Sequence, residues 1–172
     1  MRSQALRPQE LDALRAIFEA AWRDDFTSED WEHMFPGVHF LLEQDGGIAS
    51  HGAVVERELD TGDHELLTGW VENVATPPEF RGRGYGTTVV RAVSEHIASR
   101  YQLGGLDTGS RGFYERLGWQ TWRGPTNVRT DDGLVPTPDE DGAVMVLVTP
   151  TTPNDLDLGA PISCEWRPGD AW

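Results

Sequence analysis

Residues 70–100 place three features in immediate succession and constrain the fold more than any other segment. Residues 70–75 are an apolar, β-branched run, residues 81–86 carry glycine at alternate positions, and residues 87–100 have helical periodicity. Glycines let a backbone turn tightly, and a helix N-terminus presents unpaired N–H groups and a partial positive charge. A strand, a glycine loop and a helix in this order predict a cradle for a phosphate or pyrophosphate.

Three phosphate-binding patterns compete for this loop. The dinucleotide fingerprint needs G-x-G-x-x-G with an acid about 20 residues later. The glycines here are spaced G-x-G-x-G, and Asp107, the next acid after the helix, does not end a recognisable second strand of a Rossmann unit. The nucleotide-triphosphate loop needs Gly-Lys-Ser/Thr, which the sequence lacks. Arg81, Gly84 and Gly86 fit a third pattern, Arg/Gln-x-x-Gly-x-Gly/Ala, and so resemble the acyl-coenzyme A loop of the GNAT acetyltransferases. An ordinary glycine-rich connection stays open on the loop alone.

The bulk composition narrows the class of protein. The 172 residues, 38% hydrophobic and 25% charged, predict one globular domain over residues 1–172. The sequence contains no apolar run long enough to span a membrane, and we expect no secretory leader. The single cysteine, Cys164, excludes an internal disulfide, and the five histidines have no metal-ligand spacing. We therefore expect a cytoplasmic protein without a metal site.

The net charge of −15 is a second constraint on partners. It argues against nucleic acid and against anionic membrane surfaces, because both are bound by basic residues. Two interpretations of the acids remain: they provide solubility alone, or some of them line a site for a polycation.

Hydrophobic periodicity and turn residues predict an α/β (α+β) chain with a mixed sheet. The predicted helices cover residues 9–23, 31–34, 85–99 and 108–118. The predicted strands cover residues 38–43, 48–57, 65–69, 70–75, 103–106, 119–122, 143–148 and 162–166. Ser28 is predicted to cap the second helix and Asp107 the fourth, and residues 124–142 are predicted to form a long loop.

Residues 107–119 resemble the second signature of the GNAT superfamily, a polar cap followed by an aromatic–tyrosine pair, a glycine and an aromatic residue. Blocks along most of the chain resemble the aminoglycoside 2′-N-acetyltransferases, at residues 25–33, 70–75, 101–106, 118–126, 137–142 and 166–172. The resemblance implies the GNAT fold, a mixed, mostly antiparallel sheet of about six to seven strands flanked by helices. Two departures are a shorter stretch at residues 107–113 and Glu140 in place of aspartate.

The same resemblance implies an activity. It implies acetylation of the 2′-amino group of aminoglycoside antibiotics by direct transfer from acetyl-CoA in a ternary complex, which confers resistance. Acetyl-CoA is then the cosubstrate, and a homodimer is implied as well. The sequence carries no nucleophile in a recognisable motif, so we expect no covalent intermediate.

Acetyl transfer requires that the amine lose a proton, that the thioester oxygen be polarised and that the leaving thiolate be protonated. Alternation along the strand places Glu72 on the same face as Val74, where a carboxylate can take the amine proton directly or through water, and the resemblance also implies that Glu72 is the general base. Tyr114 is the predicted general acid. The backbone of Val74 and Ala75 is expected to hold the pantetheine arm and polarise the carbonyl. The pyrophosphate is expected to bind at Arg81, Gly82, Arg83, Gly84, Gly86 and Thr87, mostly through backbone N–H groups. The alternatives for the side chains of Arg81 and Arg83 are exposure to solvent or contact with the adenosine phosphate.

A cationic amino sugar needs several carboxylates around it, because charge-assisted hydrogen bonds to ammonium groups are strong. The predicted acceptor-binding residues are Asp25, Asp30, Glu72, Glu140, Asp170 and Trp172 through its carboxylate. Two alternatives remain open. One is a GNAT enzyme for another cationic amine, such as a polyamine, a small amine or a peptide N-terminus. The other is a non-catalytic protein that binds acyl-CoA or cationic drugs.

Overall fold

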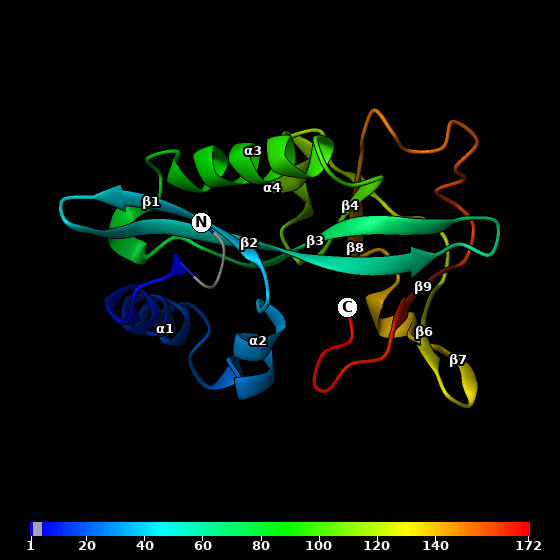
Figure 1. Ribbon diagram of the computed structural model, residues 1–172, viewed down its shortest axis with the longest axis horizontal. Coiled ribbons are helices and arrows are strands. Elements are labelled where there is room, and N and C mark those ends of the chain that lie inside the picture. Colours follow the sequence, from blue (N-terminus) through cyan, green and yellow to red (C-terminus); the bar gives the residue numbers. More distant parts are fainter. Residues whose placement is uncertain (2–4) are drawn as a thin grey trace. The chain divides into compact units, whose positions relative to one another are not determined.

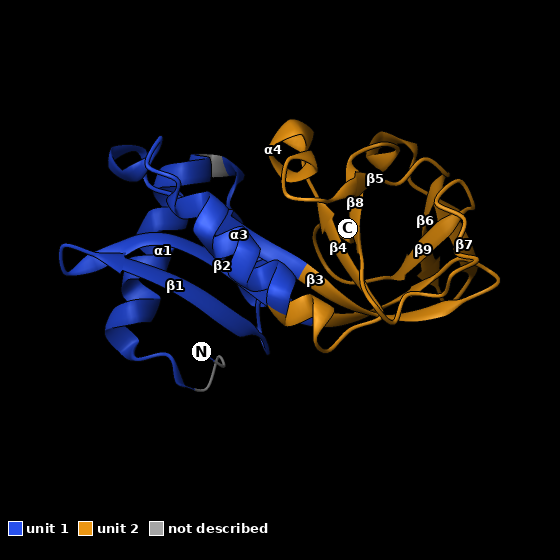
Figure 2. Ribbon diagram, turned by 90° about the horizontal axis from the view of Figure 1, so that it is seen from above, with its two compact units in different colours: residues 1–55, 71–95 blue, residues 56–70, 96–172 orange. Residues whose placement is uncertain are grey.

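A computed structural model describes residue 1 and residues 5–172, and the statements below concern these residues. The chain forms two compact units, residues 1–55 with 71–95 and residues 56–70 with 96–172 (Figure 2). Strands β2 (Gly47–Asp60) and β3 (Glu65–Ala75) are long enough to pass through both. Each unit is described separately, and the expected single domain stays a prediction.

Unit 1 holds the N-terminal helices, a β-hairpin and the glycine loop. Its further elements are α1 (Pro8–Trp22), the 3-10 helix η2 (Arg23–Asp25), α2 (Ser28–His33), β1 (Val38–Gln44), the 3-10 helix η3 (Pro78–Phe80) and most of α3 (Tyr85–Ala98) (Figure 1). Leu14 and Phe18 lie one turn apart on α1, and both are fully buried in the core of this unit. Helix α3 packs closely on β2, where a Cβ atom on Gly52 would lie 3.1 Å from Val89 Cγ1.

Unit 2 is built mainly from strands. Its further elements are β4 (Leu103–Asp107), α4 (Arg111–Glu115), β5 (Gln120–Thr121), β6 (Thr126–Thr130), β7 (Gly133–Pro136), the 3-10 helix η4 (Pro138–Glu140), β8 (Val144–Val148) and β9 (Ile162–Glu165). The strand order is β5-β8-β4-β3-β2-β9-β6-β7, with β3–β4 and β6–β9 parallel. The strands curve round the C-terminal end of the chain (Figure 2). The indole of Trp70 lies against Gly105 of β4, where any side chain would overlap it.

Two predicted caps are wrong. Helix α2 is capped by Thr27, not Ser28: Asp30 N donates to Thr27 Oγ1 at 3.1 Å and Thr27 N donates to the Asp30 carboxylate at 2.9 Å. Asp107 does not cap α4, because it is the last residue of β4 and pairs there with Val144. Ser110 occupies the N-cap position and makes no side-chain capping bond.

Two predicted boundaries and the strand number also differ from the structure. Residues 65–69 and 70–75 form one continuous strand, β3, because Thr68, Gly69 and Trp70 all pair with β4 and the ladder continues through the glycine. Residues 124–142 are not a structureless loop but the β6–β7 hairpin followed by η4. The described residues form nine strands rather than about six to seven. The main reason is that short β-prone segments lie between the glycines and prolines of residues 124–142, where β6 and β7 form.

Unit 1 buries a pair of histidines, His39 and His51, whose side chains are fully shielded from solvent. His51 Nδ1 lies 2.8 Å from the carbonyl oxygen of Asn73, and a carbonyl only accepts, so Nδ1 carries the proton. The neutral His51 Nε2 then accepts from His39 Nδ1 at 3.0 Å. Burial is the main cause that lowers the pKa of His39 to about 4 and that of His51 to about 3.

This pair predicts a loss of stability in mild acid. Because the unfolded chain binds protons near pH 6.5 and the folded chain does not, the stability is complete above pH 6.5 and falls as the pH drops toward 4. The loss from His39 is on the order of 3 kcal/mol at pH 4. Urea unfolding at pH 7 and pH 4.5 measures it. The double variant His39→Gln/His51→Gln should lose less stability on acidification than the wild type, whereas His64→Gln should lose as much.

Candidate active site

The glycine loop connects η3 to α3 in unit 1. Gly82 and Gly84 have φ values of 75° and 81°, in the left-handed region where glycine is unstrained, and nothing lies within 4 Å of a Cβ added to either. Thr88 N donates to Gly84 O at 3.0 Å, so the helical hydrogen bonds begin only there. The N–H groups of the first turn have no acceptor inside the helix and are available to an anion.

The arginines of the loop differ in their surroundings. Arg81 Nε donates to the carbonyl oxygen of Thr76 at 3.0 Å, which holds the guanidinium beside the end of β3. The guanidinium of Arg83 lies 5.8 Å from the ring centre of Phe80. Both side chains are exposed, so both can reach a phosphate in solvent.

The end of β3 carries the predicted base and has an irregular backbone. Glu72, Asn73 and Val74 are half-buried, and Ala75 is buried. Asn73 has a φ of 50°, a left-handed conformation in the middle of a strand. The regular alternation expected to place Glu72 and Val74 on one face is therefore interrupted at Asn73.

The two acids predicted near the N-terminus lie on different elements of unit 1. Asp25 is the exposed last residue of η2. Asp30 is half-buried in the first turn of α2, where its Oδ2 accepts from the N–H and hydroxyl of Thr27. The carbonyl oxygen of Asp30 accepts from the side-chain amide of Asn73 at 2.9 Å, so the structure brings Asp30 next to the strand that carries Glu72.

The predicted general acid, Tyr114, lies in α4 of unit 2 with 7% of its surface exposed. Its ring packs edge-on against Phe113 and Trp119, with ring centres 4.9 Å and 6.1 Å away. Burial raises the pKa of Tyr114 to about 12, so the phenol remains protonated at neutral pH and keeps a proton to donate.

A group of carboxylates gathers in unit 2 around the end of β4. Thr108 N donates to Ala143 O at 3.2 Å and Ala143 N donates to Glu140 O at 3.0 Å, which places Asp107 beside the residue 140–143 segment. Burial, then Asp107 and Asp170, raise the pKa of Glu140, and burial followed by Asp170 raises that of Asp107. Asp107 Oδ1 is buried without a hydrogen-bond partner among the described residues.

Sequence reasoning considered Asp107 as the acid of a dinucleotide fingerprint and as a helix cap but not as an acceptor ligand, although its position offered a signal. It is an acid at the end of an otherwise apolar, buried strand. A carboxylate in such a position is costly unless a partner compensates it.

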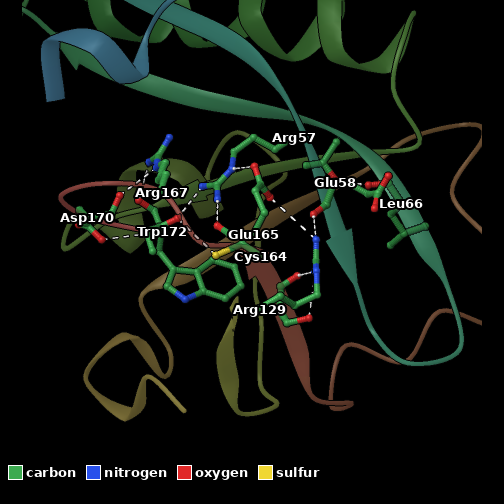
Figure 3. Close-up of polar contacts among 12 residues, drawn as sticks. Arg57, Glu58, Leu66, Arg129, Cys164, Glu165, Arg167, Asp170 and Trp172 are labelled. Carbon is green, nitrogen blue, oxygen red and sulfur yellow. Dashed lines mark hydrogen bonds and ion pairs between the residues drawn. The ribbon is translucent and has the colours of Figure 1, made fainter. Parts of the chain in front are cut away.

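The last residues of the chain are held firmly in unit 2 (Figure 3). Trp172 is 3% exposed; its indole lies 5.8 Å from the Trp70 ring and its Nε1 donates to Thr137 Oγ1 at 3.0 Å. Trp172 N donates to the Asp170 carboxylate at 3.1 Å. Arg167 Nη2 donates to the terminal oxygen of Trp172 at 3.0 Å, so the carboxylate expected to face an acceptor already has a cationic neighbour.

Arg57 is a buried cation that anchors this tail (Figure 3). Its Nη1 donates to Ala171 O at 2.7 Å and its Nε to Glu165 Oε1 at 2.8 Å, while its guanidinium lies 5.2 Å from the Trp70 ring centre. Sequence reasoning missed Arg57, because its partners are more than a hundred positions away along the chain and no local pattern marks it.

The comparisons with known proteins identify the family of this chain. A family model described as an acetyltransferase (GNAT) domain matches residues 2–122. An aminoglycoside 2′-N-acetyltransferase of Mycolicibacterium fortuitum is 40% identical over 163 residues, which are 93% of this chain and 83% of that protein. The chain belongs to the GNAT acetyltransferase family. The predicted GNAT fold class is therefore confirmed.

Solved structures support the GNAT fold at low sequence identity. A GNAT family N-acetyltransferase of Escherichia coli in complex with CoA has a TM-score of 0.67 and 13% identity, over 92% of this chain and 86% of its own. A GCN5-related N-acetyltransferase from Kribbella flavida has a TM-score of 0.58 and 17% identity over 70% of this chain. This GNAT chain spans only 33% of the length of that structure.

Two further observations concern the described residues of this GNAT chain. No helix within residues 1 and 5–172 is both long and apolar enough to cross a membrane. In the same residues, no three His, Cys, Asp or Glu side chains lie close enough together to hold a metal ion.

Proposed function

We propose that this GNAT chain transfers the acetyl group of acetyl-CoA to the 2′-amine of aminoglycosides and thereby confers resistance. The observation that carries the acceptor class is the group of mutually repelling carboxylates of Asp107, Glu140 and Asp170, which a polycation would relieve. The aminoglycoside 2′-N-acetyltransferase of Mycolicibacterium fortuitum, 40% identical, supports the choice of amino sugar and position.

The glycine loop is the proposed donor site. Backbone N–H groups of the open loop and of the first turn of α3 bind the pyrophosphate, and the exposed arginines add charge. These residues are Arg81, Gly82, Arg83, Gly84, Gly86 and Thr87. The backbone of Val74 and Ala75, at the irregular end of β3, is the proposed site for the pantetheine arm and the thioester oxygen.

The proposed chemistry is a single acyl transfer. Glu72 takes a proton from the 2′-ammonium, directly or through water, and the amine nitrogen attacks the thioester carbon. The C–N bond forms and the C–S bond breaks, and Tyr114 gives its proton to the leaving thiolate. The attacking nitrogen loses its second proton as the adduct collapses to the amide, and a proton taken up from solvent restores the Tyr114 phenol. No bond to the enzyme forms at any step.

The proposed acceptor ligands are carboxylates, and each compact unit is taken by itself. Asp25 and Asp30 belong to the N-terminal elements, and Asp107, Glu140, Asp170 and the Trp172 carboxylate belong to unit 2. A bound polycation stabilises the ionised carboxylates and lowers the raised pKa values of Asp107 and Glu140.

The change Tyr114→Phe tests the general acid. We expect kcat to fall by about 10²-fold while the KM values of both substrates change little, because the phenyl ring keeps the packing and loses the proton. Steady-state kinetics with saturating acetyl-CoA measure this. The matched control is Tyr101→Phe, because Tyr101 is another tyrosine of unit 2 and is half-buried. An equal loss of kcat in both variants would remove Tyr114 from the proposed mechanism.

The function itself is tested by thiol release from acetyl-CoA with paired aminoglycosides that carry either an amine or a hydroxyl at 2′. Release with the 2′-amino member alone, and a product acetylated at that nitrogen, is the expected result. Activity confined to polyamines or peptide N-termini would favour another GNAT substrate. Binding of both ligands without thiol release would favour a non-catalytic protein.

The assembly and location follow the family expectation. We infer a homodimer in the cytoplasm that binds neither nucleic acid nor membrane, and light scattering measures the oligomeric state.

A further inference from the structure

Asn73 combines an unusual backbone with an unusual set of contacts. It is one of three described non-glycine residues with positive φ, and the other two, Arg23 and Asp45, lie at a helix end and in a turn. Asn73 lies instead inside β3, directly after Glu72, with a φ of 50°. Non-glycine residues adopt this conformation only where surrounding contacts hold it, and asparagine tolerates it better than most.

Three contacts within unit 1 hold Asn73 in place. Its carbonyl oxygen accepts from the buried His51 Nδ1 at 2.8 Å, and His51 is in turn held by His39. Its side-chain Nδ2 donates to the carbonyl oxygen of Asp30 at 2.9 Å and lies 3.5 Å from Met34 Sδ. The backbone is thus fixed from the β2 side and the side chain from α2.

The same residue therefore joins two parts of the proposed site. Its backbone sets the direction of the chain between Glu72 and Val74, and its amide holds the first turn of α2, which carries Asp30. The capping box with Thr27 orients the Asp30 carboxylate, and the hydrogen bond from Asn73 holds the Asp30 carbonyl. Both the side chain and the backbone of Asp30 are therefore fixed.

We propose that Asn73 is a positioning residue with two separable roles: its left-handed backbone aims the Glu72 base, and its side-chain amide places the Asp30 carboxylate for the acceptor. The inference rests on the proposed function for its kinetic readout. Glycine would keep the backbone and remove the amide. Alanine would remove the amide and strain the backbone. Aspartate tolerates the backbone but presents a carboxylate, which accepts and does not donate, to the Asp30 carbonyl.

The test compares Asn73→Gly, Asn73→Ala and Asn73→Asp by steady-state kinetics with both substrates. Asn73→Gly should raise the acceptor KM about fivefold and leave kcat within about twofold, since only the Asp30 tie is lost. Asn73→Asp should resemble it. Asn73→Ala should in addition lower kcat at least tenfold, because Glu72 is displaced. The KM for acetyl-CoA should stay constant in all three.

Asp45→Gly is the matched control, because Asp45 has a similar φ of 53° but lies exposed in the β1–β2 turn. It should change neither constant. An unchanged acceptor KM in Asn73→Gly would overturn the role of the amide, and equal kcat values in the glycine and alanine variants would overturn the role of the backbone. If a variant is too unstable to assay, the remaining two still test the amide.

Hydrogen exchange separates this inference from the proposed function. Asn73→Gly should speed amide exchange in residues 28–34 regardless of substrate, and Asp45→Gly should not. If the wild type acetylates no aminoglycoside, the proposed function fails. The exchange result still tests whether the hydrogen bond from Asn73 to the Asp30 carbonyl stabilises α2. Unchanged exchange overturns that tie.

Discussion

Replacing Glu72 by glutamine should lower kcat by about two to four orders of magnitude with little change in the KM for acetyl-CoA. The amide has nearly the same size as the carboxylate but takes no proton from the acceptor ammonium. The half-buried Glu72 lies at the irregular end of β3, beside the backbone proposed to hold the thioester. Single-turnover kinetics at saturating acetyl-CoA measure the chemical step directly.

Glu65→Gln is the control for this experiment, because Glu65 is the exposed first residue of the same strand. It should keep full activity. If Glu72→Gln retained more than about a tenth of the wild-type rate, Glu72 would not be the base. Loss of acetyl-CoA affinity in Glu72→Gln would indicate a role in donor binding instead.

Replacing Trp172 by alanine should destabilise the protein by about 3–5 kcal/mol and raise the acceptor KM. The 3% exposed indole packs against Trp70 and donates to Thr137 Oγ1, so its removal leaves a cavity and takes one of the two hydrogen bonds of that hydroxyl, which still donates to Thr126 Oγ1. The backbone N–H of residue 172 still bonds to Asp170 and its terminal oxygen to Arg167, but the indole that fixes the position of this residue is lost. Urea unfolding followed by tryptophan fluorescence measures the first effect, and steady-state kinetics measure the second.

Trp166→Ala provides the comparison, since Trp166 belongs to the same tail but is 61% exposed. It should cost less than about 0.5 kcal/mol, as is usual at the surface. A Trp172→Ala variant as stable as Trp166→Ala would contradict the packing described for the tail. A stable variant with a normal acceptor KM would exclude the tail from acceptor binding.

Much of the fold was predictable because its signals are local. The predicted helix over residues 9–23 is α1 (Pro8–Trp22), and the predicted helix over residues 85–99 is α3 (Tyr85–Ala98). The glycine loop lies between β3 and α3 as expected, since glycine spacing and helical periodicity are properties of a few consecutive residues. Residues 124–142 were predicted less well, because turn residues hid the short strands of a hairpin.

The candidate site was predictable only in part, for a physical reason. Residue types and spacing were sufficient to nominate Glu72, Tyr114 and the glycine loop, because each lies in a short motif. The tertiary structure was needed for the rest: Asn73 bonds to Asp30 and His51, and Arg57 bonds to Ala171. Such contacts depend on strand register and on the packing of segments that are distant in the sequence, which determine the partners of a side chain and whether it is buried. A pattern of a few consecutive residues contains neither kind of information.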